Sequence, residues 1–455
     1  MTQRLLTSMN LHLCSWSTLI AFVLSLVLGF ACKKDEEPCV TCPPPYSHHI
    51  FLDTLLVNPT EVWMRLLSND STSLGKIQVF RDSSSILSEN IVSAETTLVD
   101  SPLLPSTVHS YRSYRLKGSE RIDSTGLIML RMMDTTSHDF IFQIDTLGDG
   151  SSSSFSDVAI INDTCIWAVG AVYLKDSTGN IDPQPYNVAK WNGTRWELQR
   201  ATVTYLGNKI NVPLEGIFAF SQTDIWLMGG FPIHGNGTSW TLYQLQDMGL
   251  SVDVSKAWGT SSSNIYFVGL NGSIAHYDGN TWIKIESGTS LQVQDVWGVA
   301  GATSADLKLF AVASSKYSNQ AKKVLQIQGV NATAFPDSGL FLSLSGIWFP
   351  KKGVKYIVGD GVFEQKELSQ NLNWRRSTQG IPQNYTEAIR GIDINDIVAV
   401  GDFGEISHYN GLSWRSYLAQ TSLPTGSYWG VSIRGNVLCA VGFVGNRAIV
   451  LVGKR

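Results

Sequence analysis

A short apolar run that ends in a small residue recurs along the second two-thirds of the chain. Successive copies end 40 to 59 residues apart. A period of about 40 to 50 residues in strand-rich sequence is typical of a β-propeller, whose blades have four strands each. The pattern predicts seven blades over residues 135–455; six are the alternative, because the fourth copy, residues 306–313, lacks the glycine and follows an insertion. The copies are CIWAVG, DIWLMG, NIYFVG, LKLFAVA, VKYIVG, DIVAVG and VLCAVG, which end at Gly170, Gly229, Gly269, Ala313, Gly359, Gly401 and Gly442.

Three repeats also share a turn with an aromatic residue on each side. These turns are WNGTRW, YDGNTW and YNGLSW, which begin at Trp191, Tyr277 and Tyr409. Asn-Gly and Asp-Gly between apolar runs favour tight hairpins, because the turn needs positive φ. We expect each aromatic pair to hold the third and fourth strands of a blade together.

The last repeat has residues for only three strands, since RAIVLVGKR alone follows its turn. Upstream of the first repeat, FIFQIDT (residues 140–146) has the pattern of a fourth strand. We therefore predict that this segment closes the ring as the outer strand of the last blade, which would leave the sheet no open edge there.

Residues 47–134 alternate short β-type runs with turn clusters, which predicts a β-sandwich. Within it, TLVDSPLLPSTVHSYRSYRL resembles the region of a fibronectin type III domain that forms a tyrosine corner, with Leu103, Pro105 and Thr107 in place. His109 stands where the tyrosine is expected, and Tyr111 follows two residues later on the same strand face. The resemblance implies a domain that spaces or adheres and does not catalyse.

Residues 1–31 have the pattern of an export signal, and the sequence LGFAC at their end resembles the lipobox of bacterial lipoproteins. That resemblance implies a diacylated Cys32 as a membrane anchor; a plain secreted protein and a single-span anchor are the alternatives. Residues 33–37, KKDEE, resemble a surface-export signal of Gram-negative lipoproteins, which implies a lipid anchor in the outer membrane at the cell surface. The alternative is a solvated charge run in a linker. Residues 32–46 would form the acylated, Pro-rich tether.

The composition argues against nucleic acid as a partner, and the cysteines and histidines predict no metal or other cofactor. Charged residues are 16% of the chain and the net charge is −4, so bulk charge does not attract nucleic acid. Cys39 and Cys42 form a C-x-x-C followed by three prolines, which favours a local disulfide or idle thiols over a redox site or a metal site with nearby histidines. Cys165 and Cys439 lie in apolar strands, where buried thiols are expected.

Catalytic patterns are weak, and we predict no catalytic residue. Asp224 and Asp396 each begin a second strand, at the repeat position of Asn264, and we interpret all three as side chains that bond their own backbone at a turn. His276 and His408 occupy equivalent third-strand positions, which indicates packing between strands.

Tryptophans in the first strands are the candidate ligand-binding residues. First strands line the axis of a propeller, so these side chains could present aromatic faces at one mouth of its channel; the alternative is that they pack one blade against the next. A second candidate surface is the first-blade insertion, residues 171–186. The four tryptophans are Trp258, Trp297, Trp348 and Trp429.

The expected fold is all-β, a fibronectin III-like sandwich followed by a propeller. The chain as a whole resembles two-domain surface lipoproteins of Gram-negative bacteria, which implies a non-enzymatic module that recognises an extracellular glycan or protein, or acts as a scaffold. One alternative is a propeller hydrolase or lyase acting on extracellular polysaccharide; another is an assembly factor for an envelope complex, which would show a large apolar patch.

Overall fold

The computed structural model describes residues 49–455, except for residues 70, 302, 304–305, 316–320, 370–371, 378–380 and 382–383. These residues belong to one compact unit. The predictions for the export signal, Cys32, the tether and the C-x-x-C lie outside the described residues. Within the described part of the chain, no helix has the length and apolar character needed to cross a membrane.

The first eight strands form two antiparallel sheets around one core. One sheet has the order β1-β2-β5, and the other has the order β4-β3-β6-β7 with β8 also paired to β6. Both sheets contribute to a single cluster of buried side chains, among them Met64, Ile77 and Tyr111. The strands are β1 (Ile50–Val57), β2 (Val62–Ser68), β3 (Gly75–Arg81), β4 (Ser84–Ile91), β5 (Glu95–Asp100), β6 (Val108–Lys117), β7 (Glu120–Ser124) and β8 (Ile128–Arg131).

Tyr111 takes the buried position on β6, and His109 does not. The Tyr111 hydroxyl donates a hydrogen bond of 2.8 Å to Asp100, which also forms an ion pair with Arg81. His109 is partly exposed and forms a 2.6 Å ion-pair contact with Asp82 at the β3–β4 turn. The buried hydroxyl is thus satisfied by a carboxylate, as a polar group in a core requires.

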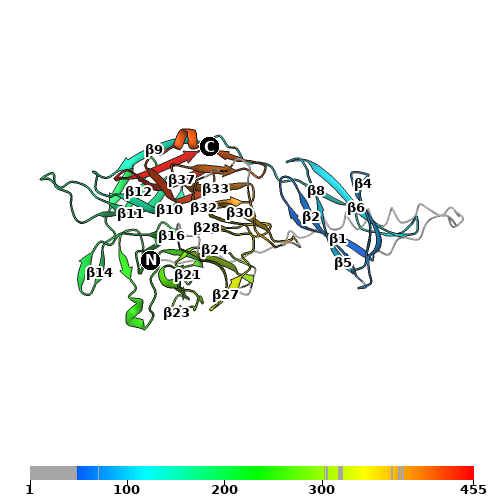
Figure 1. The fold of residues 1–455 in the computed structure, drawn as a ribbon, viewed down its shortest axis with the longest axis horizontal. Coiled ribbons are helices and arrows are strands. Elements are labelled where there is room, and N and C mark those ends of the chain that lie inside the picture. The colour runs from blue at the N-terminus through cyan, green and yellow to red at the C-terminus, as the bar shows by residue number, and fades with distance from the viewer. Residues whose placement is uncertain are drawn as a thin grey trace, which may run out of the picture. The chain divides into compact units, whose positions relative to one another are not determined.

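The rest of the described chain forms seven four-stranded antiparallel sheets in series, here called blades one to seven. Figure 1 shows them following one another in chain order from green to red. Blades one to three are β10 (Ser154–Asn162), β11 (Cys165–Val172), β12 (Tyr186–Trp191) and β13 (Trp196–Gln199); β16 (Gly216–Ser221), β17 (Asp224–Met228), β18 (Pro232–Gly235) and β19 (Trp240–Leu242); β20 (Lys256–Ser261), β21 (Asn264–Val268), β22 (Ile274–Tyr277) and β23 (Trp282–Lys284).

Blades four to seven complete the series, so the described residues give seven blades and not six. A hairpin of β14 (Val203–Tyr205) and β15 (Asn208–Ile210) lies between blades one and two, and helical turns are few: η1 (Leu245–Met248), η2 (Leu270–Gly272) and α2 (Leu418–Thr421). The blades are β24 (Val293–Val299), β25 (Lys308–Ser314), β26 (Lys322–Gln328) and β27 (Asn331–Phe335); β28 (Leu344–Trp348), β29 (Val354–Gly359), β30 (Gly361–Lys366) and β31 (Arg375–Arg376); β32 (Thr386–Asp393), β33 (Asp396–Gly401), β34 (Ile406–Tyr409) and β35 (Trp414–Ser416); β36 (Gly426–Arg434), β37 (Val437–Val444), β38 (Arg447–Lys454) and β9 (Ile141–Leu147).

The recurring glycine has a steric reason. At Gly442 a Cβ would lie 1.8 Å from the carbonyl oxygen of Ser427 in the neighbouring first strand, and at Gly170 it would lie 2.2 Å from that of Ser154. At each of the other four repeat glycines, an added Cβ would lie within 2.7 Å of a backbone carbonyl oxygen. Only a residue without a side chain allows this approach of two strands.

The aromatic-flanked turns behave as predicted. Trp191 pairs with Trp196, Tyr277 with Trp282 and Tyr409 with Trp414 across the third and fourth strands. Their ring centroids lie 5.5, 4.6 and 5.3 Å apart. The glycine of each turn has positive φ, so sequence and backbone agree at these hairpins.

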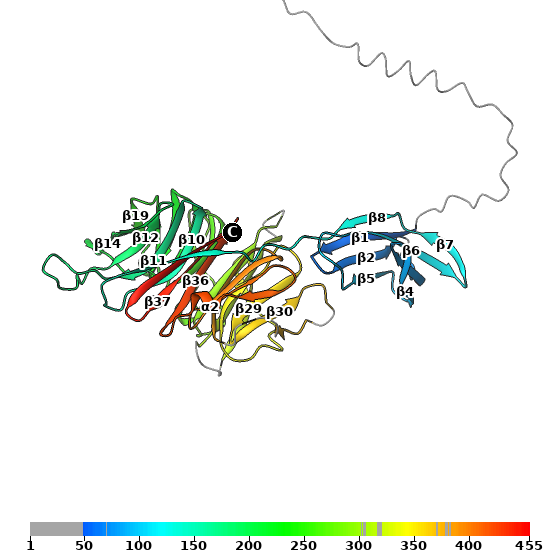
Figure 2. The same ribbon diagram turned by 90° about the horizontal axis from the view of Figure 1, so that it is seen from above.

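Strand β9 closes the ring, as predicted, one residue later than expected. It pairs with β38 from Ile141 to Leu147, and blade seven therefore combines strands from the two ends of the propeller region. In Figures 1 and 2 the cyan β9 lies beside the red strands of blade seven. The last blade thus obtains its fourth strand from the start of the propeller region.

Candidate functional site

One residue per blade occupies an equivalent position at or just before the start of the first strand, and these seven residues form what we call the bulge ring. In five blades the pairing register between the first and second strands shifts around this residue. In blades two and three the corresponding residue precedes the first strand and donates its N–H to the second strand. The ring consists of Ser156, Glu215, Ser255, Gln294, Ser345, Glu387 and Trp429.

All seven residues of the bulge ring line one cavity of about 150 Å³, together with Lys256 and Gln292. A β-bulge re-aims a side chain out of the regular alternation, and bulges are frequent beside functional sites. Positions are therefore equivalent around the ring, whereas the side chains differ: three hydroxyls, two carboxylates, one amide and one indole. This arrangement can offer hydrogen bonds in several directions and one aromatic face.

Two ion pairs lie next to the bulge ring in the first strands. Asp157 contacts Lys256 at 2.8 Å, and Asp295 accepts two bonds of 2.8 Å from the Arg390 guanidinium. Asp295 also accepts the backbone N–H of Ile347 at 3.0 Å. The ion pairs join blade one to blade three and blade four to blade six, and the bond from Ile347 adds blade five, so these contacts link first strands of neighbouring and next-nearest blades around the axis.

The lining of the cavity is acidic. Lys256 forms an ion pair with Asp157, and Glu215 and Glu387 are two carboxylates that also line the cavity. Burial raises the pKa of Glu215, the nearby Asp253 raises it further, and Lys256 lowers it. The carboxylates can accept hydrogen bonds from hydroxyl or amine groups.

A second cavity of about 160 Å³ is lined by the first strands of six blades and includes Trp297 and Arg390. The Arg390 guanidinium carbon lies 5.2 Å from the centre of the Trp297 ring. This cavity and the cavity at the bulge ring share Lys256, so both belong to the space enclosed by the first strands.

The four candidate tryptophans do not form one surface. Trp258 is 6% exposed and packs on Gly298 of the next blade, and Trp348 is 1% exposed and packs on Gly391 of the next blade. Trp297 donates its indole N–H to the carbonyl of Phe349, again in the next blade, at 3.0 Å.

Trp429 differs from the other three tryptophans because it belongs to the bulge ring. It is partly exposed, lines the acidic cavity and lies 4.7 Å from the ring of Phe443. Its Trp-Gly sequence matches that of Trp258 and Trp297, but the structure places it three positions earlier relative to the bulge. Of the four, it is the one that lines the cavity at the bulge ring.

The first-blade insertion is held mainly by its own contacts. Asp176 accepts hydrogen bonds from Thr178 and from the backbone of Asn180, and Asp182 forms a 2.6 Å ion pair with Arg200. These carboxylates are therefore engaged in shaping the loop.

The aspartates that begin second strands bond histidines across the blade. The interpretation that Asp224, Asn264 and Asp396 bond their own backbone is wrong. The side-chain oxygen of each instead accepts a hydrogen bond from the imidazole Nε2 of a histidine on the third strand. The prediction that the histidines have an equivalent packing role is confirmed by the same contacts. The pairs are Asp224 with His234 at 2.9 Å, Asn264 with His276 at 2.8 Å and Asp396 with His408 at 2.9 Å.

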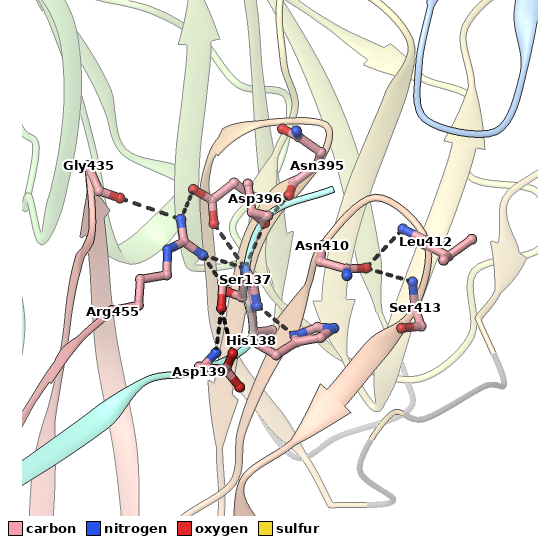
Figure 3. A network of polar contacts seen from close by, with 12 residues as sticks. Ser137, His138, Asp139, Asn395, Asp396, Asn410, Leu412, Ser413, Gly435 and Arg455 are labelled. Carbon is pink, nitrogen blue, oxygen red and sulfur yellow. Dashed lines mark hydrogen bonds and ion pairs between the residues drawn. The ribbon is translucent and has the colours of Figure 1, made fainter. Parts of the chain in front are cut away.

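In blade six this pair extends into a buried network that we call the closure clasp, shown in Figure 3. His138, from the segment before β9, contacts His408 through the two Nδ1 atoms at 2.8 Å. Arg455 forms an ion pair with Asp396, so four side chains from three parts of the chain meet. The backbone carbonyl of His138 also accepts the Tyr417 hydroxyl at 2.6 Å. The clasp fixes the strand that closes the ring.

The Asp396 carboxylate only accepts, so it favours a proton on Nε2 of His408, whereas Arg455, which only donates, also contacts that nitrogen at 3.2 Å. If His408 donates its Nε2 proton to Asp396, its Nδ1 accepts a proton from Nδ1 of His138, and Nε2 of His138 is unprotonated. That last atom is buried and has no hydrogen-bond partner among the described residues. Burial, with the His408 imidazole and Arg415 adding to it, lowers the pKa of His138 to about 4, and burial also lowers the pKa of His408.

Metal and thiol chemistry find little support in the part of the chain that the structure describes. No group of three or more His, Cys, Asp or Glu side chains there is placed to hold a metal ion. Cys165 and Cys439 are both buried free thiols, and burial raises the pKa of Cys439, which makes it a poor nucleophile.

Sequence reasoning missed the bulge ring, apart from Trp429, and missed the closure clasp. The ring residues stand three positions before the first-strand tryptophans in blades three to five, but nothing in their type marks them. His138 and Arg455 share no motif and meet only because the ring closes.

Comparison with known proteins supports the fold. No family model and no curated protein matches the sequence. Among solved structures, the WD40 β-propeller domain of Doa1 is similar with a TM-score of 0.50 and 15% identity, over 69% of this chain and 97% of that one. Ycf48 from Cyanidioschyzon merolae aligns with a TM-score of 0.49 and 14% identity, over 69% of this chain and 98% of that one. The sheet order and the likeness to the WD40 domain thus agree that the chain contains a β-propeller.

Proposed function

We propose that this chain is a non-catalytic binding module whose ligand docks at the bulge ring of the propeller. The observation that carries the proposal is the convergence of one side chain from every blade, five of them at bulges, on a single cavity. A scaffold that uses its propeller only for packing has no need for seven such side chains, five of them beside a break in strand pairing.

The lining favours a neutral glycan as the ligand. The hydroxyls of Ser156 and Ser255 and the carboxylates of Glu215 and Glu387 can bond sugar hydroxyls, and Trp429 offers an apolar face for a sugar ring. The Ser345 hydroxyl and the Gln294 amide N–H donate to the backbone carbonyls of Thr386 and Ser314, so these two side chains offer their oxygens as acceptors. The two carboxylates would repel an acidic ligand. An extracellular protein that inserts one polar or basic side chain is the alternative partner, and a glycan screen distinguishes the two.

We further propose that the module is a lipoprotein of the outer membrane, anchored through Cys32 and exposed at the cell surface. The sequence motifs alone support this location. The sheet orders β1-β2-β5 and β4-β3-β6-β7 support a fibronectin III-like sandwich, which would space the propeller from the anchor.

The test is a screen of the full-length protein against an array of neutral and acidic glycans, with a parallel assay for released sugar. We expect binding to neutral glycans without product, and at least about tenfold weaker binding by Glu387→Gln and Trp429→Ala. Phe341→Ala is the matched control, because Phe341 is an exposed aromatic residue in a loop of the propeller. Absence of glycan binding, or equal binding by all three variants, would reject the proposal.

A hydrolase is the second candidate, and one observation favours it. Glu215 has a raised pKa, as a general acid needs, and Glu387 lines the same cavity. Release of reducing sugar by the wild type, lost in both Glu215→Gln and Glu387→Gln, would establish this function in place of the first.

A further inference from the structure

A separate pocket of about 320 Å³ lies on the outer face of the five-stranded sheet of the sandwich. Its lining comes from β3, β6 and β7 and from the β3–β4 turn, and it includes Phe80, Ser110, Arg112, Tyr114 and Arg121. The volume equals that of about ten water molecules. Pockets of about 300 Å³ and more are sized for small organic ligands, so one substituted sugar ring would fit.

Two arginines, Arg112 and Arg121, line this pocket, and neither forms an ion pair with a carboxylate among the described residues. Arg121 stacks on Tyr114, with its guanidinium carbon 4.0 Å from the ring centre, and lies 5.1 Å from the centre of Phe80. Stacking occupies the face of a guanidinium and leaves the N–H groups at its edge available. Arg112 has a buried Nε with no hydrogen-bond partner in this part of the structure. Because this Nε is buried, an acceptor in the pocket would bond the terminal N–H groups of Arg112.

One carboxylate, Asp82, also lines the pocket, but its oxygens are already engaged. One oxygen accepts the backbone N–H of Ser110 at 2.8 Å, and the other contacts His109 at 2.6 Å. These hydrogen bonds, led by that from His109, lower the pKa of Asp82. Asp82 therefore stays ionised, and with Arg112 and Arg121 the lining has a net positive charge.

We propose that this pocket binds an acidic saccharide through the carboxylate of a uronic acid. Arginine forks match the geometry of a carboxylate, and a charge-assisted bond is stronger than a neutral one. The hydroxyls of Ser83, Ser110 and Tyr114 can bond the hydroxyls of the sugar. An acidic side chain of a peptide would offer the same carboxylate but would fill only a small part of the volume. The sandwich would then recognise acidic sugars, and the acidic bulge ring would not.

The test is calorimetric titration of the full-length protein with uronate oligomers containing galacturonate, mannuronate or glucuronate. The matched probes are the methyl-esterified galacturonate oligomer, which has the same rings without charge, and a short polyglutamate peptide. We expect at least one uronate oligomer to bind, about tenfold or more tightly than the ester and the peptide. Binding should weaken as salt increases from about 0.05 to 0.5 M, because screening shortens the range of the charges.

Variants locate the binding site. Arg112→Gln and Arg121→Gln should each weaken binding about tenfold, and Arg65→Gln should not, since Arg65 is an exposed arginine on the other sheet, paired with Asp53. Thermal denaturation checks that Arg112→Gln is folded, and Arg121→Gln, at an exposed position, keeps the test decisive if it is not. Failure of all three uronate oligomers, equal binding of the ester or peptide, or unchanged affinity in both pocket variants would overturn the proposal. Glu387→Gln, in the bulge ring, should leave uronate binding unchanged, so this result is independent of the propeller site.

Discussion

Acidification should loosen the closure clasp, and the structure gives the size of the effect. His138 is neutral in the folded protein because burial lowers its pKa to about 4, from an ordinary value of 6.5. An unfolded or opened segment binds a proton below pH 6.5, whereas the folded clasp does not. The contribution of His138 to stability is therefore intact above about pH 7 and is lost as the pH falls from about 6.5 to about 4.

The shift sets the magnitude. One pKa unit corresponds to about 1.4 kcal/mol, so the full loss at low pH has an upper limit of about 3.5 kcal/mol. At pH 5 the same two pKa values give an upper limit of about 2 kcal/mol. Solvent screens a ring that is only half-buried, so we expect a loss of about 1–2 kcal/mol, or about a 5- to 30-fold increase in the population of the opened segment. The pKa of His408 is also lowered, so His408 adds to the loss of stability at low pH.

The assay is hydrogen exchange of the amides of β9, corrected for the intrinsic pH dependence of exchange, at pH 7.5 and pH 5. Strand β25, deep in blade four, serves as the internal reference. We expect the opening free energy of β9 to decrease by about 1–2 kcal/mol relative to β25 in the wild type. His138→Asn keeps a side-chain N–H for His408 but cannot titrate. In this variant the opening free energy of β9 should therefore decrease much less between pH 7.5 and pH 5.

His109→Asn in the sandwich is the control for replacing a histidine elsewhere. It should leave the pH response of β9 as in the wild type. Equal pH responses of β9 in the wild type and in His138→Asn would refute the role of His138, because the loss would then come from other groups.

Three further predictions concern the anchor, a blade glycine and a buried ion pair. Cys32→Ala should move the protein from the membrane fraction to the soluble fraction on centrifugation; unchanged retention would contradict the lipid anchor. Gly442→Ala should lower stability by about 1–3 kcal/mol or more in chemical denaturation, because a Cβ would lie 1.8 Å from a backbone carbonyl, whereas Gly126→Ala, with open space at that position, should have little effect. Asp295→Ala should cost about 3–5 kcal/mol, because it leaves Arg390 buried without its carboxylate, and the melting temperature should recover in part when Arg390→Met is added; an unchanged melting temperature of the single variant would count against this role.

Local sequence patterns predicted the blades well, for physical reasons that the structure makes clear. The repeat glycine is required by the close approach of two backbones, and the aromatic-flanked turns by hairpin geometry, so both leave a trace in the sequence. The closing strand was found because FIFQIDT, residues 140–146, resembles the fourth-strand sequence WIKIES of blade three. These features depend on neighbours within one blade.

Features that depend on register or on distant partners could not be predicted. Trp429 and Trp258 both precede a glycine, yet Trp429 lies at the bulge and Trp258 lies beyond it, facing the next blade. A shift of one residue redirects a strand side chain, and the sequence does not show where pairing breaks. The clasp joins His138 to His408 and Arg455, which are far apart in the chain and meet only in the closed ring.

The most direct test of the proposed function is the affinity of the neutral oligosaccharide with the strongest array signal for the wild type and for Trp429→Ala. We predict that removing the Trp429 ring weakens binding about tenfold or more, while Phe341→Ala binds as the wild type does. Equal affinity of the wild type and Trp429→Ala, or no binding of any neutral glycan, would contradict the proposal that the bulge ring is the binding site.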